Sequence, residues 1–217
     1  LSDAVTISRV KAEMLGSRVD FTNLVLHYGG GIMTVDGTVL LESPENPSFD
    51  LTGNVDGIRY GSEAFAGKLS GEISLQGPWP RPLLRGQLYL HQGRLDITRL
   101  GKTTPTAMDI PLAVDLGIDD GLAVTGVGLL DIMAEGALHI GGSTGALQVR
   151  GRMDVARGQI VYLGTPFQVV RGWAAFGPYE ELIPDVYLEG VGEVKGVPVT
   201  LVLQGPGTDL EPRLQSE

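Results

Sequence analysis

Residues 136–176 read GALHIGGSTGALQVRGRMDVARGQIVYLGTPFQVVRGWAAF, and apolar and polar side chains alternate through them. Leu138 and Ile140 show the alternation, and Met153 and Val155 repeat it further along. A period of two predicts β-strands with one wet face and one dry face. Glycines separate the apolar runs, at points where a strand must reverse, bulge or bend. This stretch therefore predicts several consecutive strands.

The same pattern occurs earlier in the chain. Residues 71–97 read GEISLQGPWPRPLLRGQLYLHQGRLDI, and sliding Gly71 onto Gly136 brings the glycines and apolar residues of the two stretches into register. A weaker third copy, VTLVLQGPGTDLEPRL, begins at Val199. Repeated strand hairpins predict an elongated array in which each unit stacks on its neighbours. We therefore predict one continuous domain over residues 1–217, a fragment of a longer chain, with repeat units at about 69–134 and 135–199 and a partial unit at 200–217.

Composition limits the possible partners. The formal charge of −10 argues against nucleic acid, because binding to phosphates needs lysine and arginine. The chain has no cysteine, which excludes disulfides and thiolate metal sites. No apolar run reaches the roughly 18 residues of a membrane-spanning helix.

Strand boundaries follow from the turn signals. Asp36-Gly37 predicts a hairpin, and reversals are also predicted at Gln92-Gly93 and at Asp119-Asp120-Gly121. The proline-rich segment 77–82 predicts a rim or an edge rather than a central strand. No segment keeps a 3.6-residue period for more than two turns, so very little helix is expected.

No set of residues predicts catalysis. Gly141–Gly145 fits the G-x-S-x-G nucleophile elbow, but that motif needs a following helix and a downstream histidine. A strand follows Ser143 instead, and no histidine does, so a polar hairpin turn is expected there. His27, His91 and His139 lie far apart in the sequence, which favours surface positions over a metal site. The sequence predicts a protein that is not an enzyme and that has no cofactor or metal.

An alternating sheet without helices must cover its dry face in another way. Either the sheet curls until its own dry faces meet, or the dry face stays partly open and binds another apolar molecule. About 15 strands at ~4.8 Å spacing would give a strip about 70 Å long, which suits acyl chains. The alternation and the repeat place seven residues on this face, namely Ile73, Leu75, Leu88, Leu90, Leu95, Leu112 and Val114.

The ordered series Gly136-x-Leu-x-Ile, Gly151-x-Met-x-Val, Phe167-x-Val, Gly172-x-Ala-x-Phe and Val199-x-Leu-x-Leu-x-Gly resembles the C-terminal domain of TamB. This is the DUF490 family of translocation and assembly modules, within the AsmA-like group. The resemblance covers residues 122–214 most clearly and 69–100 less closely. No single motif carries it; the order of the motifs does.

The resemblance implies an all-β fold, an elongated and curled antiparallel-rich sheet called a β-taco, with a hydrophobic inner groove. Carried over by position, the groove would also be lined by Leu138, Ile140, Met153, Val155, Ile160, Tyr162, Phe167, Val169, Phe176, Val186, Leu188, Val199, Leu201 and Leu203. The expected cargo is phospholipid acyl chains or apolar unfolded strands.

The resemblance also implies a place in the cell. The family forms a periplasmic bridge in the envelope of a two-membrane bacterium, anchored in the inner membrane by a segment absent from this chain. Its expected partner is an Omp85-type outer-membrane protein (TamA/BamA-like), and its expected roles are phospholipid transport and outer-membrane protein assembly.

Two alternatives remain open. In the first, the groove is filled by its own side chains and the chain is a structural or interaction module that pairs its sheet edge with an Omp85-type partner. The second is a carbohydrate-active parallel β-helix. The Asp-Gly reversals and the lack of a placed carboxylate pair argue against it.

Overall fold

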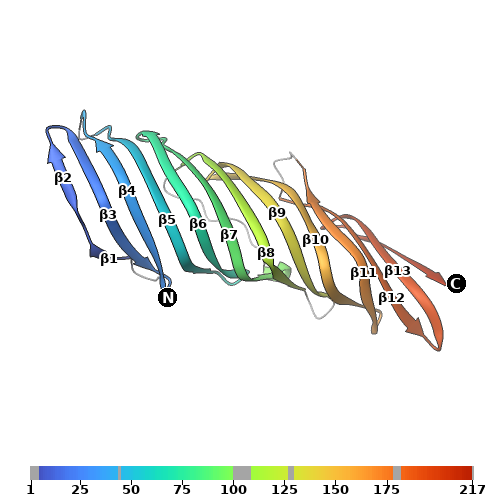
Figure 1. The fold of residues 1–217 in the computed structure, drawn as a ribbon. Helices are drawn as coiled ribbons and strands as arrows, with labels where there is room; N and C mark the ends of the chain where they lie inside the picture. The colour runs from blue at the N-terminus through green and yellow to red at the C-terminus, as the bar shows by residue number, and fades with distance from the viewer. Residues whose placement is uncertain (1–4, 44, 100–108, 127–129, 178–181, 217) are drawn as a thin grey trace.

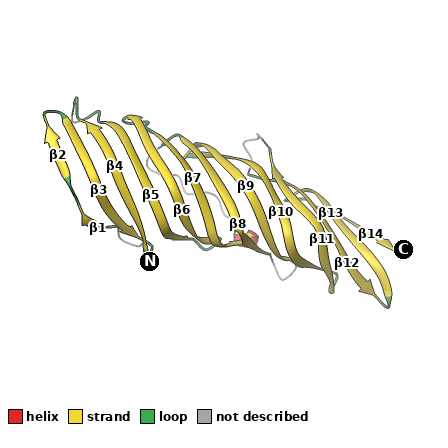
Figure 2. Cartoon of the chain, viewed as in Figure 1, coloured by secondary structure: helices red, strands yellow, loops and turns green. Residues whose placement is uncertain are grey.

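The computed structural model describes residues 5–43, 45–99, 109–126, 130–177 and 182–216. These residues form one open, curled sheet of 14 strands, which confirms the predicted all-β fold (Figures 1 and 2). One turn of 3-10 helix, Ile97–Arg99, is the only helical element among them. The strands are β1 (Thr6–Arg9), β2 (Ala12–Leu15), β3 (Arg18–Tyr28), β4 (Gly31–Leu40), β5 (Ser48–Gly61), β6 (Phe65–Pro78), β7 (Leu83–Asp96), β8 (Leu112–Gly126), β9 (Leu130–Ser143), β10 (Ala146–Tyr162), β11 (Thr165–Phe176), β12 (Asp185–Val194), β13 (Val197–Pro206) and β14 (Glu211–Ser216).

The strands follow one another across the sheet almost in chain order. From β3 to β14 each strand pairs with the next, and β1 and β2 both pair with β3 at one end of the sheet. All pairs are antiparallel except β7 with β8, which are parallel. Consecutive antiparallel strands reverse the chain direction, so their described turns lie along the two long edges of the sheet (Figure 1).

The molecule exposes more surface than a compact protein of its size. Its accessible surface is 13477 Å² for 23.0 kDa. The scaling for compact monomers gives about 9,600 Å² at this mass. The difference agrees with a single open layer that has no second sheet or helical layer over its face.

A row of β-bulges bends the strands near their middles. Bulges add a residue to one strand and make it bend more sharply, and here they lie beside one another in neighbouring strand pairs. The register shifts between Phe21 and Leu24, Val55 and Ile58, Ala66 and Lys68, Tyr89 and Gly93, Ile118 and Leu122, Val155 and Arg157, and Val169 and Arg171. We call this row of bulges the crease, because the strands that contain a bulge bend there.

Three predicted reversals are wrong, and the crease explains two of them. Gln92-Gly93 and Asp119–Gly121 are bulges inside the continuous strands β7 and β8. Gln92 (φ 53°) and Gly121 (φ 82°) do adopt the left-handed conformation that suggested a turn. A two-residue type I′ hairpin needs positive φ at two consecutive residues, and each of these bulges has only one.

Asp36-Gly37 lies inside β4 and also does not reverse the chain. The Asp36 carboxylate accepts a hydrogen bond from the backbone N–H of Asn23, at 2.8 Å, and so satisfies a donor that the bulge in β3 leaves unpaired. Gly37 has a φ of 133°. The dipeptide therefore supports a bend in the neighbouring strand rather than a turn of its own.

Candidate functional site

The two faces of the sheet differ sharply in chemistry. Residues paired directly across neighbouring strands point to the same face, so the registers assign every strand residue outside the bulges to one face or the other. One face, which we call the inner face, carries no Asp, Glu, Lys, Arg, His, Asn or Gln in the described parts of β3 to β14. The outer face carries nearly all of the charged residues of these strands.

All of the predicted groove-lining residues lie on the inner face. Cross-strand pairing shows this: Leu75 pairs with Leu84, which in turn pairs with Leu112. In the same way, Val155 pairs with Ala134, which pairs with Leu122. That these side chains contact a ligand stays a prediction. The 21 residues are Ile73, Leu75, Leu88, Leu90, Leu95, Leu112, Val114, Leu138, Ile140, Met153, Val155, Ile160, Tyr162, Phe167, Val169, Phe176, Val186, Leu188, Val199, Leu201 and Leu203.

Burial on the inner face is greatest beside the crease. Leu90 and Ile118 are each 1% exposed, Phe167 is 1% exposed and Leu201 is fully buried. Toward the long edges the inner-face side chains are half-buried, as at Leu75. The base of the groove is thus filled by its own side chains, and apolar surface remains accessible on the walls above it.

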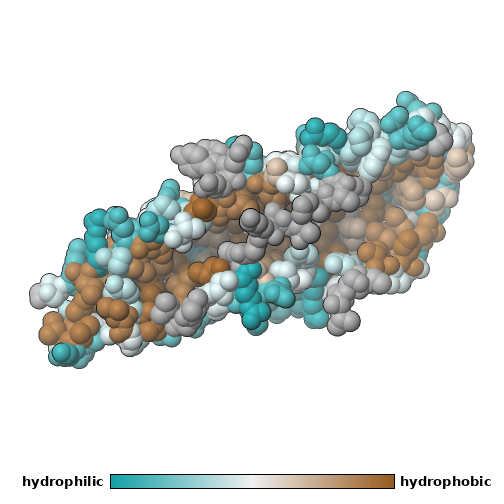
Figure 3. All heavy atoms as spheres, turned by 180° about the vertical axis from the view of Figure 1, so that it is seen from behind, coloured by the Kyte–Doolittle hydropathy of each residue, from teal (hydrophilic) through white to brown (hydrophobic). Residues whose placement is uncertain are grey.

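The packing at the base is continuous from β6 to β13. One cluster centres on Leu90, Ile118 and Met153, and a second on Phe167 and Leu201. Leu130, Val155 and Val169 pack against both clusters and join them. Figure 3 shows the result as a hollowed apolar stripe along the long axis of the molecule, bordered by polar margins.

Several inner-face residues are missed by the sequence prediction. Val35 and Val55 are buried at 8% and 7% exposure, in the part of the chain whose strand facing the sequence did not assign. Leu122 follows the β8 bulge, where the sequence predicts a reversal, and Ile132 lies in the next strand, β9. The bulges in β3, β5, β7, β10 and β11 shift the alternation by one residue, so counting by twos fails across them, whereas β8 keeps its alternation through its bulge. The repeat alignment carries the count across the bulges in β7 and β10, as far as Leu95 and Ile160, but its two stretches, 71–97 and 136–162, contain none of these four residues.

The outer face carries exposed ion pairs and hydrogen bonds between side chains. A hydrogen bond from Thr38, followed by one from Arg18, holds the pKa of Asp20 below its ordinary value. Such exposed pairs contribute little to stability. The outer face is therefore a solvated surface, and the asymmetry between the faces is what defines the site.

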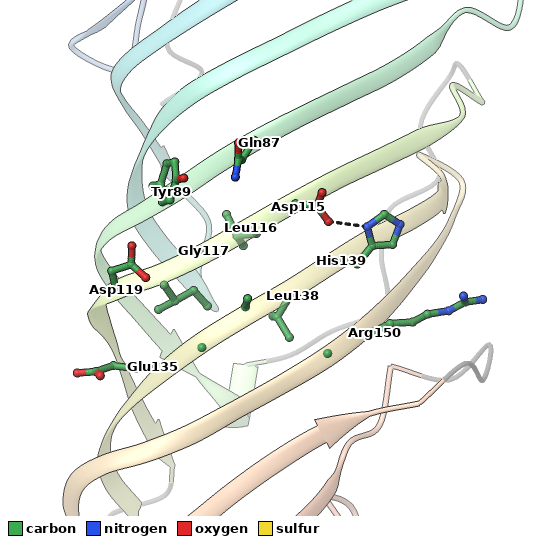
Figure 4. A pocket seen from close by; sticks show the side chains of 14 residues that line it. Gln87, Tyr89, Asp115, Leu116, Gly117, Asp119, Glu135, Leu138, His139 and Arg150 are labelled. Atoms are coloured by element: carbon green, nitrogen blue, oxygen red, sulfur yellow. Dashed lines mark hydrogen bonds and ion pairs between the residues drawn. The ribbon is translucent and has the colours of Figure 1, made fainter.

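A shallow depression of about 860 Å³ lies on the outer face over β7 to β10 (Figure 4). His139 Nδ1 lies 2.8 Å from Asp115 Oδ1 within it, and His91 pairs with Asp120 in the same way at 2.6 Å. Among the described residues no three His, Cys, Asp or Glu side chains gather closely enough to hold a metal ion. The histidines lie on the wet face, as the sequence predicted.

Ser143 has a structural role. It is buried at 9% exposure, at the end of β9, and its hydrogen bond to Asp109 is the main reason that the pKa of this carboxyl lies below its ordinary value. The turn that follows leads directly into β10, so the G-x-S-x-G segment is a hairpin turn, as predicted.

Three outer-face side chains stack across β10, β11 and β12. The rings of Trp173 and Tyr187 lie 6.1 Å apart at 16°, and the Arg152 guanidinium lies 4.9 Å from the Trp173 ring. Glu189 accepts a hydrogen bond from the Tyr187 hydroxyl and thereby raises the pKa of Tyr187. Trp173 thus packs against the outer face of the sheet.

We expect Trp173→Ala to lower the free energy of unfolding by about 2 kcal/mol, because it removes an aromatic pair and a cation–π contact. Chemical denaturation followed by circular dichroism measures this. Gln168→Ala is the control, since Gln168 is an exposed outer-face residue of the same strand, and it should change stability by less than about 0.5 kcal/mol. An equal effect of both substitutions would show that the stack is energetically neutral.

An open sheet bent along its midline, apolar inside and polar outside, defines the chain as a β-groove protein. Among the described residues no helix is both long and apolar enough to span a bilayer.

The family model of the TamB C-terminal domain matches residues 25–217. The chain therefore belongs to the TamB C-terminal domain family, which confirms the resemblance seen in the sequence. The family is a component of the bacterial envelope and belongs to a translocation and assembly module for outer-membrane proteins. No curated protein matches the chain.

Proposed function

We propose that the inner face conducts phospholipid acyl chains through the periplasm, between the inner and outer membranes, and that this supports outer-membrane assembly. The observation that carries the proposal is the complete absence of charged and amide side chains from the described inner face of β3 to β14. The twelve strands from β3 to β14, in succession at about 4.8 Å spacing, give an apolar strip about 55 Å long. Apolar strips of this size mark interaction sites.

The chemistry of the inner face favours acyl chains over unfolded polypeptide. A strand lying along the groove would bring N–H and C=O groups against a surface whose own backbone groups are already paired within the sheet. Each unsatisfied group would cost about 1–3 kcal/mol. An acyl chain has no such groups, and it gains about 25 cal/mol for each Å² of apolar surface removed from water.

Transport of this kind is passive. The lining repeats along the length, so successive positions offer nearly equal contacts to a sliding chain. Near-equal sites favour movement along the groove over tight capture at one point. The protein thus supplies an apolar path and needs no chemistry of its own.

Native mass spectrometry of the chain purified from bacterial cells without detergent tests the proposal. We expect adducts with the masses of phospholipids, which collisional activation releases. Protein that carries no lipid, both as purified and after incubation with phospholipid vesicles, would contradict the proposal and favour a groove that serves only as a structural module.

A second candidate function is strand addition at the free edge of β14. All of β14 is exposed, and among the described strands it pairs only with β13, so an Omp85-type partner could add a strand at its other side. Pro212 lacks an N–H, and Glu211 and Arg213 are charged, which are features that protect edges from pairing. This candidate therefore ranks second.

A further inference from the structure

The few polar side chains of the inner face all lie along one long edge of the sheet. Outside the bulges, the described inner face of β3 to β14 has hydroxyl groups at five positions and no other polar side chain. These positions are at strand ends that meet the same edge, which holds the β3–β4, β5–β6 and β10–β11 turns. They are Tyr28, Tyr60, Tyr162, Thr165 and Ser216.

On the described strands β3 to β14, the inner face has no hydroxyl or other polar side chain along the opposite long edge. There the strand ends carry apolar side chains, including Phe49 at the start of β5 and Phe176 at the end of β11. We call the two edges the tyrosine margin, defined by Tyr28, Tyr60 and Tyr162, and the phenylalanine margin, defined by Phe49 and Phe176. The inner-face side chains of the strands therefore carry hydroxyl groups at the tyrosine margin and not at the phenylalanine margin.

The tyrosine hydroxyls are free to meet a ligand. None of the three is hydrogen-bonded to another described residue, although Tyr60 packs its ring against Phe65 at 6.2 Å. Tyr60 is half exposed, at 50%, and Tyr162 packs against the cluster at the groove base. A tyrosine with its ring in an apolar surface and its hydroxyl at the boundary suits the junction between acyl chains and headgroups.

Positive charge lies beside this margin. Arg59 and Lys68 are directly opposite each other on the outer face of β5 and β6, next to the Tyr60 strand end. Neither forms an ion pair with a described acidic residue. Directly opposed like charges destabilise a sheet, so stability alone does not explain the pair. A phosphate group would compensate both charges.

From this geometry we infer that the groove holds phospholipid in one orientation across its width. The phosphate headgroup lies at the tyrosine margin beside Arg59 and Lys68, and the acyl chains run from there toward the base. This inference rests on the proposed function and adds to it the placement of the headgroup. The phenylalanine margin contacts acyl carbon only.

Photocrosslinking with two phospholipid probes tests the orientation. One probe carries a diazirine on the headgroup and the other carries it at the end of an acyl chain, and mass spectrometry maps the adducts. We expect headgroup adducts in peptides around Tyr60 and Tyr162, at least about fivefold more often than around Phe49 and Phe176. Acyl-chain adducts should map to inner-face peptides of the base and walls.

Matched variants move the hydroxyls between the margins. The triple change Tyr28→Phe, Tyr60→Phe and Tyr162→Phe keeps the rings and should reduce the headgroup preference by about fivefold. The pair Phe49→Tyr and Phe176→Tyr adds hydroxyls to the other margin and should make headgroup adducts appear there. Circular dichroism of each variant verifies that the sheet is intact.

The outcomes separate the two proposals. Equal headgroup adducts at both margins of the unsubstituted protein, with acyl-chain adducts inside the groove, would overturn the orientation and leave lipid conduction standing. Absence of acyl-chain adducts from inner-face peptides would overturn conduction itself. A triple variant that keeps the full preference would show that the tyrosine hydroxyls do not set the orientation.

Discussion

Val155→Asp should reduce lipid transfer by the groove at least about tenfold. Val155 is half-buried on the inner face of β10 and packs against both clusters at the base. A carboxylate there must be desolvated by any passing acyl chain, and an unpaired buried charge costs several kcal/mol. Since 1.4 kcal/mol corresponds to a factor of ten, a single charge suffices to block a narrow path. The measurement is transfer of fluorescent phospholipid between vesicles by the purified chain.

Gln159→Asp is the control, because Gln159 is exposed on the outer face of the same strand and gains the same charge. It should transfer lipid at the rate of the unsubstituted protein. Val155→Thr keeps the shape of the side chain and adds only a hydroxyl, so it should have an intermediate effect. Wild-type transfer by a folded Val155→Asp variant would argue strongly that lipid does not pass over this part of the inner face.

Gly71→Ala should lower the free energy of unfolding by about 3–5 kcal/mol. Gly71 lies in the inner-face ladder between Val55 and Leu88 and has a φ of 136°, which a residue with a side chain rarely adopts. A Cβ at this position would overlap the Gln87 carbonyl oxygen and would lie 3.0 Å from Leu88 Cα. The expected loss combines backbone strain with overpacking against a backbone that cannot move aside. Urea denaturation measures it.

Gly164→Ala separates the two contributions. Gly164 also has positive φ, at 80°, but it lies in the turn between β10 and β11 and has open space where a Cβ would stand. Its substitution should cost only the backbone strain, about 1 kcal/mol. If Gly71→Ala and Gly164→Ala lowered the free energy of unfolding by the same amount, the requirement for glycine at position 71 would not come from close packing of the ladder.

Alternation of apolar and polar residues predicts the sheet and its apolar face, because successive side chains of a β-strand point to opposite faces. Leu138 and Ile140, or Leu201 and Leu203, must share a face in any extended strand. The repeat adds register: it places Leu88 where Met153 stands in the second unit, and both lie on the inner face. The absence of helical periodicity then predicts a sheet without a helical layer over it, and leaves open whether the sheet closes on itself or stays partly open.

Bulges are what the sequence does not resolve. A glycine or polar residue with positive φ looks the same in a hairpin turn as in a bulge, so Gln92 and Gly121 predict reversals that do not occur. The difference lies in the pairing of the neighbouring strand, which is not a local property. The orientation of phospholipid across the groove also cannot be inferred from the sequence. That Tyr28, Tyr60 and Tyr162 lie at the same edge becomes evident only from the strand directions.

The central claim is that acyl chains contact the inner face and not the outer face. The chain has no cysteine, so single cysteines carrying an environment-sensitive fluorophore can be introduced without removing native thiols. Neighbouring residues provide matched sites, with Leu75 and Leu138 on the inner face and Gln76 and Ala137 on the outer face. Phospholipid with brominated acyl chains should quench the fluorophore at the first two positions and leave it unchanged at the other two. Equal quenching on both faces, or quenching on neither, would contradict the account.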